Sequence, residues 1–276
     1  MAVRVQRPRS GQSGKALLLT ILGEFVLPSG GSIWTSTLVE SLALLGIGEP
    51  NARQAVARLR DDGIVESFRV GRSTRWDLTS TGERLLTTGA KRIYEFGSVP
   101  NDWDGQWLLA LTAVPEELRK KRAEVRSQLA FEGFGFLTTG VAISPHAERL
   151  DEVQSILAAL ELDPVPLVFV ARRGDLASDA EIIGRSWDLD ALSTKYRQFT
   201  GGFSNVIPEG GAACFSSLVR LVHEWRRFPF EDPEIPLKLL PANWPAQNAK
   251  RVFDRCRADW SSESHGWFLA LERSIR

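Results

Sequence analysis

The stretch EPNARQAVARLRDDGIVESFRVGRSTRWDL (Glu49–Leu78) decides how the amino-terminal part of the chain folds. Its first half predicts a helix, because Pro50 suits a first helical turn and apolar residues follow at helical spacing. These apolar residues form one inward face: Ala52, Ala55, Val56 and Leu59. Gly63 ends the helix after Asp61-Asp62, since glycine adopts the left-handed conformation without strain.

A basic hairpin is predicted to follow this helix. Ile64–Val70 and Ser73–Leu78 have the composition of strands, and Gly71-Arg72 forms a tight turn between them. A helix with Arg and Gln on its outer side, next to a hairpin with Arg near its tip, predicts a winged helix. In that fold the helix side chains reach base edges in the major groove, and the hairpin guanidinium groups hold phosphates.

The side chains expected to contact DNA follow from this prediction. Arg53, Gln54 and Arg58 would contact base edges, and the hairpin residues would hold phosphates or enter a minor groove. The full set is Asn51, Arg53, Gln54, Arg58, Arg60, Arg69, Arg72, Ser73 and Arg75. A charged helix face alone is more often simply solvated, and Asp61-Asp62 dilutes this one. The prediction therefore also depends on the neighbouring elements.

Further helices are predicted on both sides of this stretch. Lys15–Leu27 forms the first helix, and a second runs from a cap at Ser32 or Thr35 to about Leu45. Another helix opens at Ser80-Thr81. The buried side of the first helix is predicted to consist of Leu18, Leu19, Leu22, Phe25 and Val26. Helix, helix, turn, helix and hairpin therefore follow in winged-helix order.

The composition is that of a globular protein: 43% of the 276 residues are hydrophobic and 25% are charged, with a formal net charge of zero. Residues 1–96 hold thirteen Lys and Arg against nine Asp and Glu, whereas the remainder of the chain is acidic. A basic amino-terminal module on an acidic body fits a protein that meets nucleic acid through its first part.

The cysteines, histidines and amino terminus point to no metal site and no membrane anchor. Cys214 and Cys256 form no C-x-x-C pair, and the three histidines lack metal-ligand spacing. The basic start resembles a signal peptide only superficially, because Gly23-Glu24 interrupts its apolar run and no A-x-A site follows. We expect a flexible basic arm, reduced thiols and a cytoplasmic protein.

The middle of the chain has a different pattern. Strands at Gln106–Val114, Phe134–Ser144 and Leu167–Val170 alternate with helices at Pro115–Gly133 and Ala147–Leu162. If the second strand divides in two, this is the order of a ferredoxin-like sandwich. The basic residues 119–122 are interleaved with glutamates at pairing distances, which favours a solvated helix face over a second nucleic-acid site.

The last part is predicted to be helical and rich in tryptophan. The expected helices cover 180–193, 192–203, 212–227 and 246–260, followed by a final helix around Trp267. A proline-rich connector precedes the last two. The fold class is therefore α+β, with domains at 1–98, 99–176 and 177–276.

At this point the chain resembles the PaaX-type family of bacterial transcriptional repressors. The resemblance rests on LLLTILGEFV, IWTSTLVESLALLGI, NARQAVARLRDDG, RVGRSTRWDLTSTG, WDGQW and DPEIPLKLLPANWP. It implies a winged helix, a Cas2-like middle domain and a helical carboxy-terminal domain. It also implies a homodimer that binds a double-stranded DNA operator of a phenylacetate-type catabolic operon and is released by phenylacetyl-CoA or a related acyl-CoA.

A site for such an effector needs cations for phosphates and an apolar slot for the acyl group. The candidates are Arg172, Arg173, Lys195, Tyr196, Phe199, His223, Trp225, Arg226 and Arg227. Core packing is the more ordinary role for the aromatic members of this set.

Nothing in the sequence points to catalysis. Cas2-type nucleases carry an acidic metal ligand at the end of the first strand, and WLLALTAV contains no acid. We therefore expect no enzyme and no cofactor. The alternatives left open are a small-molecule-binding protein or enzyme that uses the winged helix for protein contact, and an activator in place of a repressor.

Overall fold

The structure is a computed structural model that describes residues 14–97 and 103–274. The predicted basic arm and the predicted boundary at 98/99 lie outside these residues. The chain forms two compact units. The first consists of the described residues up to Phe96, of Phe199–Arg226 and of the residues from Lys250 on. The second consists of Gly97–Gln198 and Arg227–Ala249. The segment 177–276, predicted as one helical domain, thus contributes to both units.

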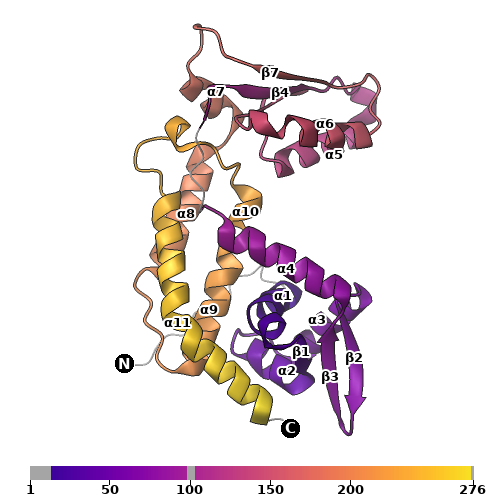
Figure 1. Cartoon of the computed structure of the whole chain (residues 1–276), viewed down its shortest axis with the longest axis vertical. Coiled ribbons are helices and arrows are strands. Elements are labelled where there is room, and N and C mark those ends of the chain that lie inside the picture. The colour runs from indigo at the N-terminus through magenta and orange to yellow at the C-terminus, as the bar shows by residue number, and fades with distance from the viewer. Residues whose placement is uncertain (1–13, 98–102, 275–276) are drawn as a thin grey trace. The chain divides into compact units, whose positions relative to one another are not determined.

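The amino-terminal part of the first unit contains the elements that a winged helix comprises (Figure 1). In chain order they are α1 (Gly14–Ile21), β1 (Ser32–Trp34), α2 (Thr35–Ala43), α3 (Glu49–Asp61), β2 (Val65–Val70), β3 (Ser73–Leu78) and α4 (Ser80–Glu95). The three strands form an antiparallel sheet in the order β1-β3-β2. Gly63 and Gly71 have φ angles of 71° and 61°, so glycine occupies the left-handed positions at the end of α3 and at the hairpin turn.

Two local predictions in this region were wrong, the cap at Ser32 and the full burial of Leu19. Ser32 caps no helix but begins β1, whose residues pair with Arg75–Asp77 of β3. The helix predicted to open at Ser80-Thr81 is α4, and Thr79 before it accepts its capping hydrogen bond, from Gly82 N at 3.0 Å. In the first helix Leu17 is fully buried whereas Leu19 is only half-buried.

The remainder of the first unit is helical, with α9 (Gly211–Trp225) and α11 (Ala246–Ser274). Phe25 of the π-helical turn Leu22–Val26 lies at its centre, fully buried, with ring centroids 4.7 Å from Phe215 and 5.2 Å from Phe268. The predicted break near Trp260 was wrong, because α11 is continuous. The hydroxyls of Ser261 and Ser264 donate to carbonyls one turn earlier, so this polar run stays helical.

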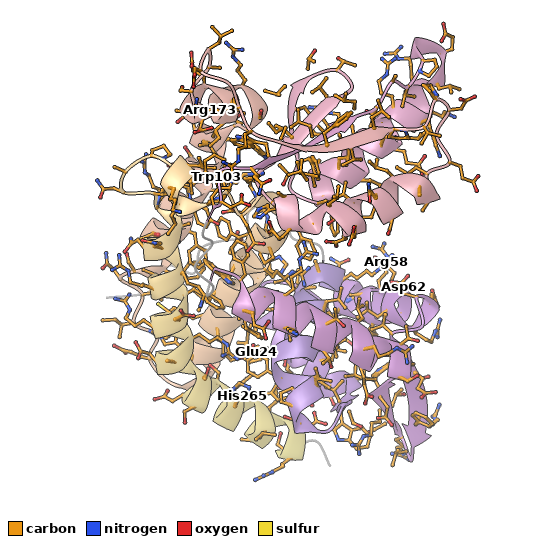
Figure 2. All side chains as sticks on the ribbon, turned by 45° about the horizontal axis from the view of Figure 1, so that its top comes forward. Glu24, Arg58, Asp62, Trp103, Arg173 and His265 are labelled. Carbon is orange, nitrogen blue, oxygen red and sulfur yellow. The ribbon has the colours of Figure 1, made fainter. Side chains whose placement is uncertain are left out.

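A buried charge joins three helical segments of this unit. The Glu24 side chain is 2% exposed and accepts a hydrogen bond from Arg257 Nη2 of α11 at 3.1 Å. Tyr94 of α4 donates its hydroxyl to the same carboxylate. Nε2 of His265 lies 3.0 Å from the Glu24 carbonyl oxygen, and Figure 2 shows these two residues side by side. Burial, followed by the charge of Glu24, raises the pKa of Tyr94 far above its usual range, so its proton stays on the hydroxyl.

The second unit contains the ferredoxin-like sandwich, as predicted. Its elements are β4 (Trp107–Leu111), α5 (Arg119–Phe131), β5 (Gly135–Thr138), β6 (Val141–Ser144), α6 (Leu150–Ala159) and β7 (Leu167–Ala171). The strands lie in the antiparallel order β5-β6-β4-β7, which the alternation of strands and helices requires in this fold. Leu108 of β4 packs with Val125 and Leu129 of α5 and with Val153 and Leu157 of α6 in one buried core.

Shorter helices accompany a second core of this unit. They are α7 (Asp179–Ser186), the start of α8 (Leu189–Phe203) and α10 (Phe228–Glu231). Trp107 and Ile143 of the sheet pack here with Ile183 of α7. Gly135 allows the close approach, because a Cβ on it would lie 2.6 Å from both Ser186 Cβ and Trp187 Cε2.

Candidate nucleic-acid interface

The outer face of α3 is set by what the helix buries. Ala52, Ala55, Val56 and Leu59 are between 0% and 4% exposed, which fixes the rotation of the helix. The five predicted DNA contacts of this helix are all exposed: Asn51, Arg53, Gln54, Arg58 and Arg60. The rotation that buries the apolar face therefore presents the whole predicted set to solvent.

The three arginines of this face differ in their surroundings. Arg53 forms an ion pair with Glu49 at 2.8 Å, and Arg60 forms one with Asp61 at 2.9 Å. Within residues 14–97 and 103–274, Arg58 has no ion-pair partner. Its guanidinium is at the surface of the first unit in Figure 2. Arg58 is therefore the side chain of α3 whose charge is most available to an outside acceptor.

The hairpin places its basic residues in two ways. Arg69, Arg72 and Ser73 are exposed around the turn, and Arg69 Nε donates to Gly71 O at 3.4 Å. Arg75 instead lies across the sheet, 3.5 Å from Asp77 and 5.6 Å from the ring centroid of Trp34. Because β1 supplies Trp34, and β1 was not predicted, the sequence did not reveal that Arg75 is engaged within the sheet.

A hollow of about 350 Å³ brings the helix and the hairpin together. Arg53 of α3 lines it together with Arg72 and Ser73 of the β2-β3 hairpin, which is the wing of a winged helix. Thr35 and Ser36 at the start of α2 also line it, and neither is among the residues predicted to contact DNA. The remaining lining residues are Val39, Glu40, Glu49 and Thr74. The Thr35 hydroxyl donates to Thr74 O at 3.0 Å, so the donors that suit phosphate oxygens here are the guanidinium groups and the hydroxyls of Ser36 and Ser73.

The candidate effector residues of the first unit contact other residues of that unit, and all of them are buried except the half-buried Arg226. Trp225 is 1% exposed, donates from Nε1 to Ile93 O at 3.1 Å and stacks on Phe253 with centroids 4.7 Å apart. Phe199 packs against Trp225 at 5.3 Å. His223 and Arg226 both contact the Thr20 hydroxyl, at 3.2 and 3.3 Å, and burial lowers the pKa of Arg226. The structure thus brings these four residues together around the helical core.

The candidates of the second unit divide between core and surface. Tyr196 is fully buried, stacks on Phe228 at 4.1 Å and donates its hydroxyl to Asp232. The others are basic residues in surface positions: Lys195 and Arg227 pair with Glu231 at 3.0 and 3.1 Å, Arg173 pairs with Asp179 at 2.9 Å, and Arg172 is exposed. The role of all nine candidates in effector binding stays a prediction.

The burial of Asp232 leads to a prediction about how the stability of the protein depends on pH. Burial raises the pKa of this carboxyl above 3.8, although hydrogen bonds from Tyr196 and from Glu234 N oppose the shift. The folded state therefore binds this proton more tightly than the unfolded state, and the ionised carboxylate costs stability above the folded pKa. That cost declines as the pH falls from the folded pKa toward 3.8.

We expect Asp232→Asn to be more stable than the wild type at pH 7, with a difference in free energy of unfolding that shrinks as the pH falls. Urea unfolding at several pH values between the two limits measures this difference. Asp175→Asn, at an exposed position of the same unit, is the control. If the difference in free energy of unfolding between Asp232→Asn and the wild type did not change with pH, the raised pKa of Asp232 would be contradicted.

The described part of the chain contains neither a candidate metal site nor a candidate membrane-spanning helix. No group of three or more His, Cys, Asp and Glu side chains is placed to hold a metal ion. Among the same residues, no helix has the length and apolar character needed to cross a bilayer.

Comparison with known proteins gives a consistent result along the chain. Three family models match: "PaaX-like protein" over residues 13–82, "PaaX protein central Cas2-like domain" over 100–183, and "PaaX-like protein C-terminal domain" over 187–270. The transcriptional repressor PaaX of Escherichia coli (strain K12) is 31% identical over 252 residues, which cover 87% of this chain and 78% of that protein.

A solved structure supports the fold. The uncharacterized protein Rv0674 from Mycobacterium tuberculosis superposes with a TM-score of 0.64 at 20% identity, covering 92% of this chain and 98% of that one. At this identity the likeness concerns the fold alone. With three matching domain models and a relative above 30% identity over most of both sequences, the chain belongs to the PaaX family.

Proposed function

We propose that this protein is a cytoplasmic, DNA-binding transcriptional repressor. The observation that carries the proposal is the hollow in which Arg53 of α3 meets Arg72 and Ser73 of the β2-β3 hairpin, together with the exposed guanidinium of Arg58 on the same helix. The helix offers bidentate donors to base edges, and the wing offers charge to the backbone. The name of the Escherichia coli relative, a transcriptional repressor, supports the same function.

The proposal includes a homodimer on a palindromic operator of a phenylacetate-type catabolic operon. Two copies of the winged helix would meet two half-sites, since the symmetry of such an operator mirrors that of a dimer. Phenylacetyl-CoA or a related acyl-CoA would release the operator. The test is a mobility-shift titration on DNA from the upstream region of the protein's own gene, with and without phenylacetyl-CoA.

Specific retention that the thioester releases would support repressor and effector class together. Retention without release would keep the DNA-binding function and overturn the effector. Absence of specific retention at low salt would overturn the proposed operator.

Arg58→Ala and Arg72→Ala should have different effects on DNA binding. We expect Arg58→Ala to weaken operator binding by about 2 kcal/mol and non-specific binding much less, because a base contact carries sequence information. Arg72→Ala should weaken both and lower the salt slope by about 1, because a phosphate contact releases counterions. Lys120→Ala, exposed on α5 of the second unit, is the charge-matched control. Equal losses in both assays from Arg58→Ala would remove this residue from base recognition.

A further inference from the structure

The second unit contains a groove that none of the nine candidate effector residues lines. Its volume is about 940 Å³, within the range that small-molecule sites occupy. Residues from α5, β5, α7, the start of α8 and the segment 238–241 surround it. Because these segments are far apart in the sequence, only the folded unit assembles the groove.

The apolar part of the groove is aromatic. Trp103 lies edge-on to Trp107 with centroids 5.2 Å apart, and its Nε1 donates to Gln106 O at 2.7 Å. Trp187 donates from Nε1 to Gly133 O at 3.2 Å. The indole nitrogens of Trp103 and Trp187 therefore each have a partner in the protein, so these two rings contribute apolar surface to the groove. Phe136, Ile183 and Leu239 extend this surface. A flat apolar group is the kind of ligand that such walls accommodate.

A cation lies on the same wall. The Arg126 guanidinium carbon is 3.9 Å from the centroid of the Phe136 ring, which fixes the side chain against the groove. Among the residues that the structure describes, Arg126 has no carboxylate partner. A planar guanidinium held by stacking, with its N–H groups open, binds carboxylate or phosphate oxygens well.

Most of the acidic lining is already engaged by the protein. Asp179 pairs with Arg173 at 2.9 Å. Asp188 accepts a hydrogen bond from Ala191 N at 2.9 Å, at the start of α8. Asp190 is the third carboxylate of the lining, set against Arg126, Arg185 and Lys238. The Lys238 ammonium donates to Trp103 O at 3.2 Å. The lining therefore holds three carboxylates and three cations, and Arg126 is one of the cations that no carboxylate pairs among the residues that the structure describes.

We propose that this groove binds an amphipathic organic anion. Its flat apolar or aromatic group would lie against Trp103 and Trp187, and its carboxylate or phosphate would lie on Arg126. This inference rests on the proposed function insofar as the groove would be the effector site. Two sources share the required chemistry: a free aryl acid and its coenzyme A thioester.

Isothermal titration of the full-length protein tests the groove directly. The probes are phenylacetate, phenylacetyl-CoA and coenzyme A. We expect one site per chain for phenylacetate or for phenylacetyl-CoA, and whichever binds more tightly identifies the source. Arg126→Gln should weaken that binding about tenfold, the loss of a charge-assisted hydrogen bond. Arg119→Gln, exposed on the same helix and outside the groove, should leave the affinity unchanged.

Two further variants examine the aromatic and cationic parts separately. Arg126→Lys keeps the charge but loses the planar stack, so its affinity should fall between those of the wild type and Arg126→Gln. Trp103→Phe should reduce the change in intrinsic fluorescence that the ligand causes.

Three outcomes would overturn the proposal. They are no binding of either aryl compound at millimolar concentration, equal affinities of Arg126→Gln and Arg119→Gln, and coenzyme A alone binding as tightly as its thioester. The last result would show that the aromatic walls of the groove contribute nothing to the affinity for the ligand. Operator binding without any ligand is measured on the same variants. Intact operator binding together with an unoccupied groove would overturn this inference and leave the proposed DNA binding in place.

Discussion

Gly82→Ala is expected to lower the free energy of unfolding of the first unit by about 3 kcal/mol, the upper part of the range for an overpacked site. A Cβ on Gly82 would lie 2.2 Å from Ile64 O and 3.1 Å from Ile64 C. The obstacle is backbone and cannot rotate away. Ile64 O also accepts the hydrogen bond from Thr79 N at 3.0 Å, so moving it disturbs the base of the hairpin. The first turn of α4 would therefore have to move away from the backbone at Ile64.

The same helix offers a control of opposite sign. A Cβ on Gly89 would meet no heavy atom within 4 Å, so Gly89→Ala should stabilise α4 by about 0.5–1 kcal/mol. Urea unfolding followed by circular dichroism measures both variants. If Gly82→Ala were as stable as the wild type, the close contact between α4 and Ile64 would be wrong. If both variants lost stability equally, the effect would not be steric.

Arg257→Ala is expected to destabilise the first unit by about 3 kcal/mol, because it leaves the Glu24 carboxylate buried without its cation. The Glu24 side chain is 2% exposed, whereas that of Arg257 is 38% exposed. The expected loss of stability is therefore at the lower end of the range for breaking a buried ion pair. The guanidinium carbon also lies 4.2 Å from the centroid of the Tyr94 ring, and this contact is lost as well.

A double-mutant cycle separates the charge from the packing. Glu24→Gln removes the charge and keeps the shape, so adding it to Arg257→Ala should recover part of the lost stability. Arg251→Ala, exposed on the same helix, should change stability by less than about 0.5 kcal/mol. Additive losses in the double variant would mean that Glu24 and Arg257 do not interact in solution.

Local patterns predicted the elements of this fold well. In α3 and the hairpin, each residue choice agrees with its neighbours: Pro50 at the start, apolar residues at helical spacing, Gly63 at the end and Gly71 at the turn. The ferredoxin-like unit was predictable for the same reason, since alternating strands and helices leave few topologies. Exposure of the α3 side chains followed directly from the buried face.

Contacts between distant segments were not predictable. Strand β1 has three residues, too few for a sequence pattern, and yet it brings Trp34 to Arg75. Glu24 and Arg257 are ordinary charged residues in the sequence, and only the fold makes one the buried partner of the other. The groove around Trp103 and Arg126 has the same origin, because no single segment contains its chemistry.

The aromatic cluster around Phe25 has a consequence for the order in which the protein folds during synthesis. Its partners Phe215 and Phe268 leave the ribosome long after the residues of α1, at an elongation rate of about 5–20 residues per second. The first unit therefore cannot complete its core until Phe268 has emerged, whereas the sheet of the second unit is available earlier. A nascent chain should protect β4–β7 from protease before it protects α1, so the segment made first is the one that matures last.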